Sequence, residues 1–372
     1  MTNYSHDPRV VLTLDAGGTN FVFSALRSNQ EIIEPVRLPS NADNLPRCLQ
    51  TLTQGFQAVL QKLPADALPA AISFAFPDPA DYVHGVIGDL PNLPAFRGGI
   101  PLGGYLEEQF HLPVFINNDG NLYAYGEALG GFLPHLNQRL AEQGSPRRYQ
   151  NLIGITLGTG LGAGVVINGT LLRGDNDCGG NIWCFRDKYH TDMIAEESVS
   201  IHAIKRMYKE FSGENRPELT PKDICQIANQ EAEGNQEAAL STFRHFGRGL
   251  GHALAFALNL VDGAVVIGGG VSAAHPLFMP DLLDELNGTL NRFDASPVGR
   301  LIAEAVYIDE KSDAKALLEG QTTYVRIPES TKAVLYNSTK KIPVAISSID
   351  TSFAINLGAY NFALNELDKA KN

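Results

Sequence analysis

Residues 114–131 read VFINNDGNLYAYGEALGG, and this stretch decides the fold. It opens with three apolar residues of β-branched or aromatic character, which predict a buried strand. Gly120 ends that strand before a segment whose apolar residues have helical spacing. Asn118 and Asp119 are therefore expected at the carboxyl end of a strand, which is where ligands bind in open α/β sheets. Both residue types are also preferred helix caps, so a purely structural role stays open.

The composition limits the class of protein. A chain of 372 residues is long enough for two domains, each with its own core. Its 44% hydrophobic and 19% charged residues are typical of a globular protein and not of a disordered one. The net charge is −12, and lysine and arginine are scattered along the chain. This charge disfavours a nucleic-acid partner and an anionic membrane surface.

The cysteines and the chain start indicate a cytoplasmic protein. Four cysteines at irregular spacing do not read as a disulfide framework. Residues 1–9 are polar and contain no apolar signal core, and nowhere do about twenty apolar residues run together.

A glycine-rich turn joins two predicted strands near the start of the chain. The first strand covers residues 10–15, the turn reads AGGTN at residues 16–20, and a second strand follows. Such a turn exposes backbone N–H groups without an obstructing Cβ, which suits an anion or a metal-bound phosphate. Asp15 would be costly to bury without a partner, and a water-bridged Mg²⁺ is one such partner. A plain tight hairpin is the alternative.

The same layout recurs at residues 152–167, which read LIGITLGTGLGAGVVI. The recurrence suggests two related halves, each with a hairpin that grips phosphate. Four alternating glycines weaken a strand, so we expect another backbone or a ligand to approach them closely. A third glycine cluster, VVIGGGVS at residues 265–272, follows a predicted long helix at residues 235–261 and should face a nucleotide.

These elements, in this order, resemble the sugar kinases of the ROK family, within the actin, hexokinase and Hsp70 ATPase superfamily. The resemblance spans roughly residues 10–275 and rests on two phosphate motifs, a sugar-side loop, a substrate and catalytic motif and an adenosine motif. The phosphate motifs are residues 15–20 and 157–164, the sugar-side loop is residues 92–94, the substrate and catalytic motif is residues 118–121, and the adenosine motif is residues 266–272. Residues 357–360 fit the family's closing helix.

The resemblance implies an α/β protein with the two-domain, actin-like ATPase (ribonuclease H-like) fold and an interdomain cleft for sugar and ATP. The first domain is expected to cover residues 1–117 plus about 357–372, and the second domain residues 118–356. The second domain contains an unusually long, turn-rich segment at about 309–347, which we expect to add a strand pair and to which we assign no function.

The resemblance also implies an ATP-dependent hexose kinase of glucokinase type. A sugar hydroxyl is a poor nucleophile at neutral pH, and Asp119 is the expected general base. The expected sugar-binding residues are Asn92, Asn118, Asn181 and Glu196. The expected nucleotide-binding residues are Asp15, Gly17, Gly18, Thr19, Asn20, Gly158, Thr159, Gly160, Gly268, Gly269 and Gly270. Mg²⁺ is expected to bind at Asp15 through water. Two alternatives stay open: Asn92 as an ordinary turn residue, and Glu196 as a solvated helix residue.

The chain departs from the family at residues 179–184, which read GGNIWC. Family members usually carry Glu-Ile-Gly-His there, followed by a cysteine-rich zinc loop, so Asn181 replaces the Glu and Cys184 replaces the His. No cysteine occurs between Cys184 and Cys225, and we therefore expect no structural zinc. A different site made of Cys178, Cys184, His190 and His202 matches no compact pattern. We expect aromatic packing to hold the loop instead, through Trp183, Phe185 and Tyr189.

Two other functions remain as alternatives. A sugar-responsive ROK regulator would need a DNA-binding module, for which the residues before the first predicted strand leave no room. A pseudokinase that binds sugar or nucleotide without turnover is motivated by Asn181 and Cys184. The expected partners are a hexose and ATP, and the sequence leaves a homodimer open.

Overall fold

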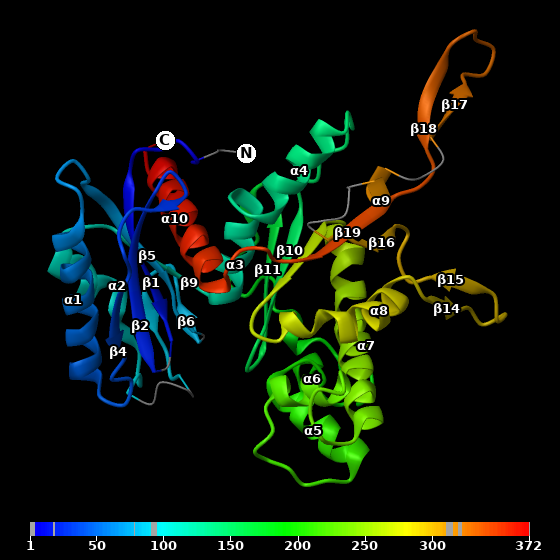
Figure 1. Cartoon of the computed structure of the whole chain (residues 1–372). Coiled ribbons are helices and arrows are strands. Elements are labelled where there is room, and N and C mark those ends of the chain that lie inside the picture. The colour runs from blue at the N-terminus through cyan, green and yellow to red at the C-terminus, as the bar shows by residue number, and fades with distance from the viewer. Residues whose placement is uncertain are drawn as a thin grey trace. The chain divides into compact units, whose positions relative to one another are not determined.

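The computed structural model describes residues 4–17, 19–77, 79–90, 95–309, 315–318 and 322–371. The chain forms two compact units (Figure 1). Unit 1 comprises Met1–Pro134, Gly164–Gly180 and Ile349–Asn372, and unit 2 comprises His135–Ala163 and Asn181–Ser348. None of the helices among the described residues combines the length and the apolar character needed to span a membrane.

Unit 1 is built on a mixed sheet with the strand order β3-β2-β1-β5-β9, in which β4 also pairs with β2. The first two strands form the predicted antiparallel hairpin, and β5 and β9 run parallel to β1. The strands are β1 (Val10–Ala16), β2 (Asn20–Arg27), β3 (Gln30–Glu31), β4 (Val36–Pro39), β5 (Pro69–Ala75) and β9 (Val114–Asn117). A separate small sheet contains β6 (Ala80–Asp81), β7 (Val86–Ile87) and β8 (Ile100–Pro101).

Alternate residues of β1 enter two different hydrophobic cores, because successive side chains of a strand point to opposite faces. Leu12 and Leu14 belong to a core that includes residues of α1 (Leu45–Lys62) and α2 (Leu102–Phe110). Val11 belongs to a second core with residues of α10 (Thr351–Lys369). Helices therefore cover both faces of the sheet, which explains the unbroken apolar run at its centre.

Two glycines let α3 (Asp119–Leu129) and α10 touch backbone to backbone. A Cβ on Gly126 would overlap the carbonyl oxygen of Ala354, and a Cβ on Gly358 would overlap that of Leu122. This packing places α3 in unit 1, whereas the boundary predicted from the sequence begins the second domain at residue 118. Residues 349–356, which the predicted boundary assigns to the second domain, also belong to unit 1.

Unit 2 is built around the parallel strands β10, β13, β19 and β16, within a sheet of order β12-β11-β10-β13-β19-β16. The boundary between the units falls inside β11. The strands are β10 (Leu152–Leu157), β11 (Leu161–Ile167), β12 (Thr170–Leu171), β13 (Ala264–Gly268), β16 (Glu304–Tyr307) and β19 (Lys341–Ile346). The glycine-rich turn between β10 and β11 falls where the sequence predicts it.

Helices precede, connect or follow these strands along the chain, and Figure 1 labels them. They are α4 (Phe132–Glu142), α5 (Ile201–Ser212), α6 (Pro221–Ala228), α7 (Gln236–Val261), α8 (His275–Leu286) and α9 (Lys315–Leu318), with the 3₁₀ turns η1 (Ile182–Cys184), η2 (Ala195–Glu197) and η3 (Ser272–Ala274). The long helix predicted at residues 235–261 is confirmed as α7, which begins at the cap Asn235.

Two ribbons of two strands each extend from unit 2 (Figure 1). One pairs β14 (Thr289–Asn291) with β15 (Pro297–Gly299), and the other pairs β17 (Thr322–Arg326) with β18 (Ala333–Asn337). The second ribbon confirms the strand pair predicted within residues 309–347. Tyr324 is 77% exposed and Leu335 is 58% exposed, so this ribbon presents apolar side chains to solvent.

Candidate active site

The carboxyl edge of the unit 1 sheet brings Asp15 near the loop at residues 118–120. In the parallel pairing, Leu14 lies opposite Phe74 of β5, and Ala75 of β5 lies opposite Asn117 of β9. Asp15 and the Asn118-Asp119 pair therefore leave the sheet at the same edge with one strand between them. Adjacent strands lie about 4.8 Å apart, so the two backbones are separated by roughly 10 Å.

Asn118 and Asp119 begin α3. The Asn118 side chain caps the helix by accepting a hydrogen bond from the N–H of Gly120 at 2.8 Å, and Oδ1 of Asp119 accepts from the same N–H at 2.8 Å. The capping role considered for Asn118 is thus present. Asp119 is the first residue of the helix and is exposed. A carboxylate at this position is favoured by the positive end of the helix dipole.

Two buried asparagines, neither of which is among the predicted site residues, hold this loop by hydrogen bonds. Oδ1 of Asn117 accepts from the N–H of Asn118 at 2.8 Å and from Nδ2 of Asn121 at 3.1 Å. Asn117 is 1% exposed and Asn121 is 4% exposed. The sequence feature that indicates this role is the run of asparagines at a strand end, because an asparagine side chain there can hydrogen-bond to the nearby backbone.

Asp15 has a partner that lies far away in the sequence. Ser352, at the start of α10, donates a hydrogen bond from Oγ to Oδ2 of Asp15 at 2.6 Å. In the adjoining turn, a Cβ on Gly17 would lie 2.9 Å from the carbonyl oxygen of Asn20, so this position requires glycine. Thr19 is exposed and follows in the same turn, and Asn20 begins β2. Gly18 and Asn92, both predicted site residues, lie outside the described residues.

In unit 2 the other two glycine clusters lie side by side. Thr156, at the end of β10, lies opposite Gly268, at the end of β13. Gly269 has a φ of +87°, and a Cβ there would overlap the backbone of Leu157. The predicted nucleotide residues Gly158, Thr159 and Gly160 are thereby gathered at one sheet edge with Gly268, Gly269 and Gly270. Gly270 has no atom within 4 Å of its Cβ position among the described residues, so that side of the turn is open.

The alternating glycines of residues 158–164 have identifiable neighbours. A Cβ on Gly160 would overlap the carboxylate of Glu196, one on Gly162 the hydroxyl of Thr156, and one on Gly164 the carbonyl oxygen of Gly120. The close backbone approach expected from the sequence is present at Gly164, whereas the neighbours of Gly160 and Gly162 are side chains. Gly164 permits the start of α3 to pack directly on β11.

Glu196 supports the glycine turn of unit 2. It lies in η2, half-buried, and its Oε2 accepts a hydrogen bond from the N–H of Leu161 at 2.8 Å. Because Glu196 is half-buried and bonded to Leu161, it is not the solvated helix residue of the alternative interpretation. The predicted sugar contact of Glu196 stays a prediction.

The segment after Asn181 is partly held by aromatic packing. Phe185 and Phe256 of α7 form an edge-to-face pair with ring centroids 6.3 Å apart, and the rings of Tyr189 and His245 lie 4.8 Å apart. Trp183 is 40% exposed, and its Nε1 donates to Oδ1 of Asn181 at 3.2 Å. The expected packing is thus confirmed for Phe185 and Tyr189, whereas Trp183 orients the side chain of Asn181.

Two carboxylates also fix this segment. Oδ1 of the buried Asp187 accepts from the N–H groups of Tyr189 and His190, both at 2.8 Å. Nζ of Lys188 lies 2.8 Å from Oε1 of Glu285, which is also paired with Arg300. Burial raises the pKa of Glu285, but the neighbouring His252, the hydrogen bond from Lys188 and the charges of Lys188 and Arg300 lower it more, to about 2. Glu285 therefore stays ionised and keeps the segment anchored.

Cys178, Cys184, His190 and His202, the zinc ligands of the alternative pattern, do not form one group. Among the residues that the structure describes, no three His, Cys, Asp or Glu side chains form a group suited to a metal ion. Cys178 and Cys184 are exposed.

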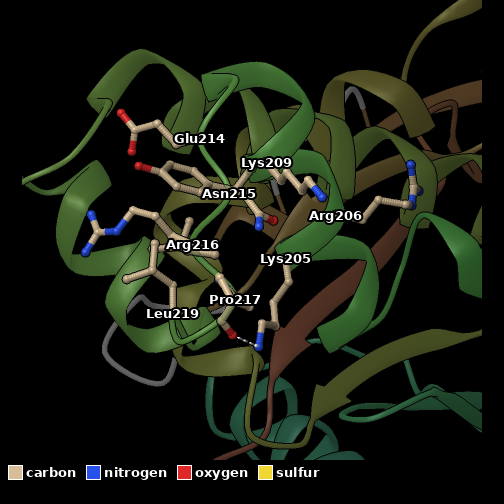
Figure 2. A pocket seen from close by; sticks show the side chains of 10 residues that line it. Lys205, Arg206, Lys209, Glu214, Asn215, Arg216, Pro217 and Leu219 are labelled. Carbon is tan, nitrogen blue, oxygen red and sulfur yellow. Dashed lines mark hydrogen bonds between the residues drawn. The ribbon is translucent and has the colours of Figure 1, made fainter.

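A cavity of about 290 Å³ between α5 and α6 lies apart from the predicted residues (Figure 2). Three of its basic side chains are engaged: Lys205 donates to the carbonyl oxygen of Pro217 at 2.7 Å, and Arg216 pairs with Glu218 at 3.1 Å. Arg206 donates to Glu210 at 3.0 Å. None of the predicted site residues lines this cavity.

Two α/β units, each with glycine-rich turns at a sheet edge and one with a carboxylate at the start of a helix, define the class of actin-like phosphotransferases. Comparison with protein-family models matches residues 11–313 to the ROK family, and the chain belongs to that family. The family and the two-domain actin-like α/β fold predicted from the sequence are confirmed.

Individual relatives support this assignment. The chain is similar to the crystal structure of a glucokinase from Parabacteroides distasonis, with 50% identity, a TM-score of 0.86 and coverage of 98% of this chain and 99% of that chain. It is 28% identical over 294 residues to a glucokinase of Halalkalibacterium halodurans, covering 70% of this chain and 80% of the relative. It is also 28% identical over 212 residues to a xylose repressor of Caldicellulosiruptor bescii, but covers only 47% of that protein.

Proposed function

We propose that this chain is an ATP-dependent hexose kinase of glucokinase type in which Asp119 is the general base. The kinase class rests on the family and on the 50% identity to a glucokinase over nearly the whole chain. The observation that carries the role of Asp119 is its place as an exposed carboxylate at the carboxyl edge of the unit 1 sheet, on the same edge as Asp15.

The reaction requires a proton acceptor beside the sugar. The attacking hydroxyl transfers its proton to the Asp119 carboxylate while its oxygen forms a bond to the terminal phosphorus and the bond to ADP breaks. The hydrogen bonds of Asn117 and Asn121 hold the Asp119 loop in a fixed position, so little reorganisation is needed. Asn118, Asn181 and Glu196 would read the sugar hydroxyls, as would Asn92.

The phosphates would be held mainly by backbone groups. Gly17, Gly158 and Gly160 carry no Cβ that would obstruct a phosphate. The N–H of Gly158 donates to the carbonyl oxygen of Gly160 at 3.1 Å, so Gly17 and Gly160 would supply the backbone donors. Thr19 and Thr159 would add hydroxyl donors. Gly18 and Asn20 complete the first turn, and Gly268, Gly269 and Gly270 would face the adenosine. We also propose that the protein acts in the cytoplasm, in keeping with its charge and cysteine pattern.

The identity of the sugar is tested by an ATP-coupled assay over aldoses, ketoses and N-acetylhexosamines. We expect phosphoryl transfer to a hexose, with glucose preferred, as the similarity to glucokinases supports. ATP binding without phosphoryl transfer to any sugar would instead support the pseudokinase alternative.

Asp15 suits a Mg²⁺ ion bound with the nucleotide, since a carboxylate at an exposed glycine turn is a hard oxygen donor. When bound, Mg²⁺ would neutralise charge that develops on the transferring phosphoryl group. We expect activity to require Mg²⁺ or Mn²⁺, and Asp15→Ala to raise the metal concentration needed for half-maximal rate and to lower the rate. A metal titration of the initial rate measures both. Metal-independent transfer would show that the Asp15 hairpin is only structural.

We propose that the protein holds no structural zinc. The segment that follows Asn181 is anchored by Asp187 and by the Lys188–Glu285 pair, so it has other means of keeping its conformation. Elemental analysis of purified, tag-free protein should find zinc far below one ion per chain. Near-stoichiometric zinc that a chelator removes together with folded structure would contradict this, and Cys178 and Cys184 would then be the first ligands to test.

We also propose that the chain forms a homodimer through the β17–β18 ribbon. Isolated two-stranded ribbons are marginally stable, and this one is apolar on both faces, with Tyr324 opposite Leu335 on one face and Val325 opposite Val334 on the other. Residues 322–341 carry four basic residues and one acidic residue, which complements a chain of net charge −12.

Light scattering after size exclusion tests the dimer. The parent should elute at twice the chain mass, and the double variant Tyr324→Ser with Leu335→Ser should elute as a monomer. Leu290→Ser on the β14–β15 ribbon is the matched control, because Leu290 is also apolar and 56% exposed. A monomeric parent would refute this part of the proposal.

A further inference from the structure

Ser352 makes the hydrogen bond that fixes Asp15. Its Oγ lies 2.6 Å from Oδ2 of Asp15, a distance typical of a hydroxyl that donates to an ionised carboxylate. Both side chains are half-buried, so the bond is only partly exposed to competing water. The two residues are 337 positions apart in the sequence, and no local pattern indicates the contact.

The backbone that carries Ser352 is held rigidly. Oδ1 of the cap residue Asp350 accepts hydrogen bonds from the N–H groups of Ser352 at 2.9 Å and of Phe353 at 3.1 Å. Further along the helix, α10 packs closely against α3 at Gly358. The hydroxyl of Ser352 is therefore presented from a fixed position.

The contact leaves one oxygen of Asp15 for another role. Ser352 occupies Oδ2, and no hydrogen bond from a described residue reaches Oδ1. Asp15 also lies beside the N-terminus of α10. A carboxylate with one oxygen anchored and the other at a glycine turn is arranged to receive a hydrated cation.

We propose that Ser352 is a positioning residue that orients Asp15 toward the metal of the bound nucleotide. The inference rests on the proposed role of Asp15 in the kinase reaction. Ser352 lies in the first turn of α10, so the orientation of Asp15 depends on the start of that helix within unit 1.

The test is a titration of Mn²⁺ with a non-hydrolysable ATP analogue, followed by electron paramagnetic resonance. Ser352→Ala should weaken Mn²⁺ binding by about tenfold, the lower end of what loss of a partner in the outer shell of a metal site causes. Ser352→Thr keeps the hydroxyl and should restore binding to within about twofold of the parent. Circular dichroism should show both variants folded.

Ser24→Ala is the matched control, because it removes a hydrogen bond from a serine hydroxyl to the carboxylate of Glu31, at 2.8 Å, in the same sheet but not at Asp15. It should leave the Mn²⁺ affinity close to that of the parent. If Ser24→Ala weakens Mn²⁺ binding as much as Ser352→Ala does, a general loosening of unit 1 explains the effect and the inference is wrong.

Two other results separate the inference from the function it rests on. Parent-like Mn²⁺ affinity in Ser352→Ala overturns the positioning role and leaves the kinase proposal standing. A parent protein that binds the nucleotide analogue but no Mn²⁺ overturns the metal role of Asp15, and the inference falls with it.

Discussion

Asp119→Asn is expected to lower kcat by about a thousandfold while changing the affinity for the sugar by less than about threefold. The amide has nearly the same shape as the carboxylate and can still accept a hydrogen bond from the N–H of Gly120. It cannot accept the proton of the sugar hydroxyl, so only the chemical step should suffer. A coupled assay for ADP measures kcat, and calorimetric titration measures sugar binding.

Asp66→Asn is the control for this variant. Asp66 is an exposed carboxylate whose partner is the surface residue Arg27, at 3.4 Å. Its loss should leave both kcat and sugar affinity unchanged, because an exposed ion pair contributes little. If Asp119→Asn retains turnover within about tenfold of the parent, a change of about 1.4 kcal/mol in the barrier, Asp119 is not the general base.

The largest effect on stability is expected for Gly358→Ala. The new methyl group would overlap the carbonyl oxygen of Leu122, a backbone atom that cannot rotate away. The helices α3 and α10 would have to separate, which opens the core that contains Leu357, Tyr360 and Leu364. We expect a loss of at least about 3 kcal/mol in the free energy of unfolding, at the upper end for overpacking. Urea unfolding followed by circular dichroism measures it.

Gly104→Ala is a matched substitution with the opposite expectation. Gly104 lies inside α2, is exposed, and has no atom within 4 Å of its Cβ position among the described residues. Alanine should therefore stabilise the helix by up to about 1 kcal/mol. Should Gly358→Ala change stability by less than about 1 kcal/mol, the close approach of α3 and α10 is not a constraint on the fold.

The sequence determined the elements that carry the candidate site. A short β-branched run that ends in Asn118-Asp119-Gly120 predicts a strand followed by a helix, and β9 and α3 are found there. The glycine clusters after β10 and β13 were likewise evident, because glycine after an apolar run is a local signal of a strand end. The family followed from the order of these motifs.

The side chains that support the elements of the candidate site can be identified only in the tertiary structure. Asp15 is bonded to Ser352, Leu161 to Glu196, and Lys188 to Glu285, and the members of each pair are separated in the sequence by 35 residues or more. Gly126 and Gly358 lie within helices, and their function in packing appears only when α3 meets α10. Hydrophobic periodicity reports which face of one element is buried. It carries no information about which distant element covers that face, and these contacts are made between such elements.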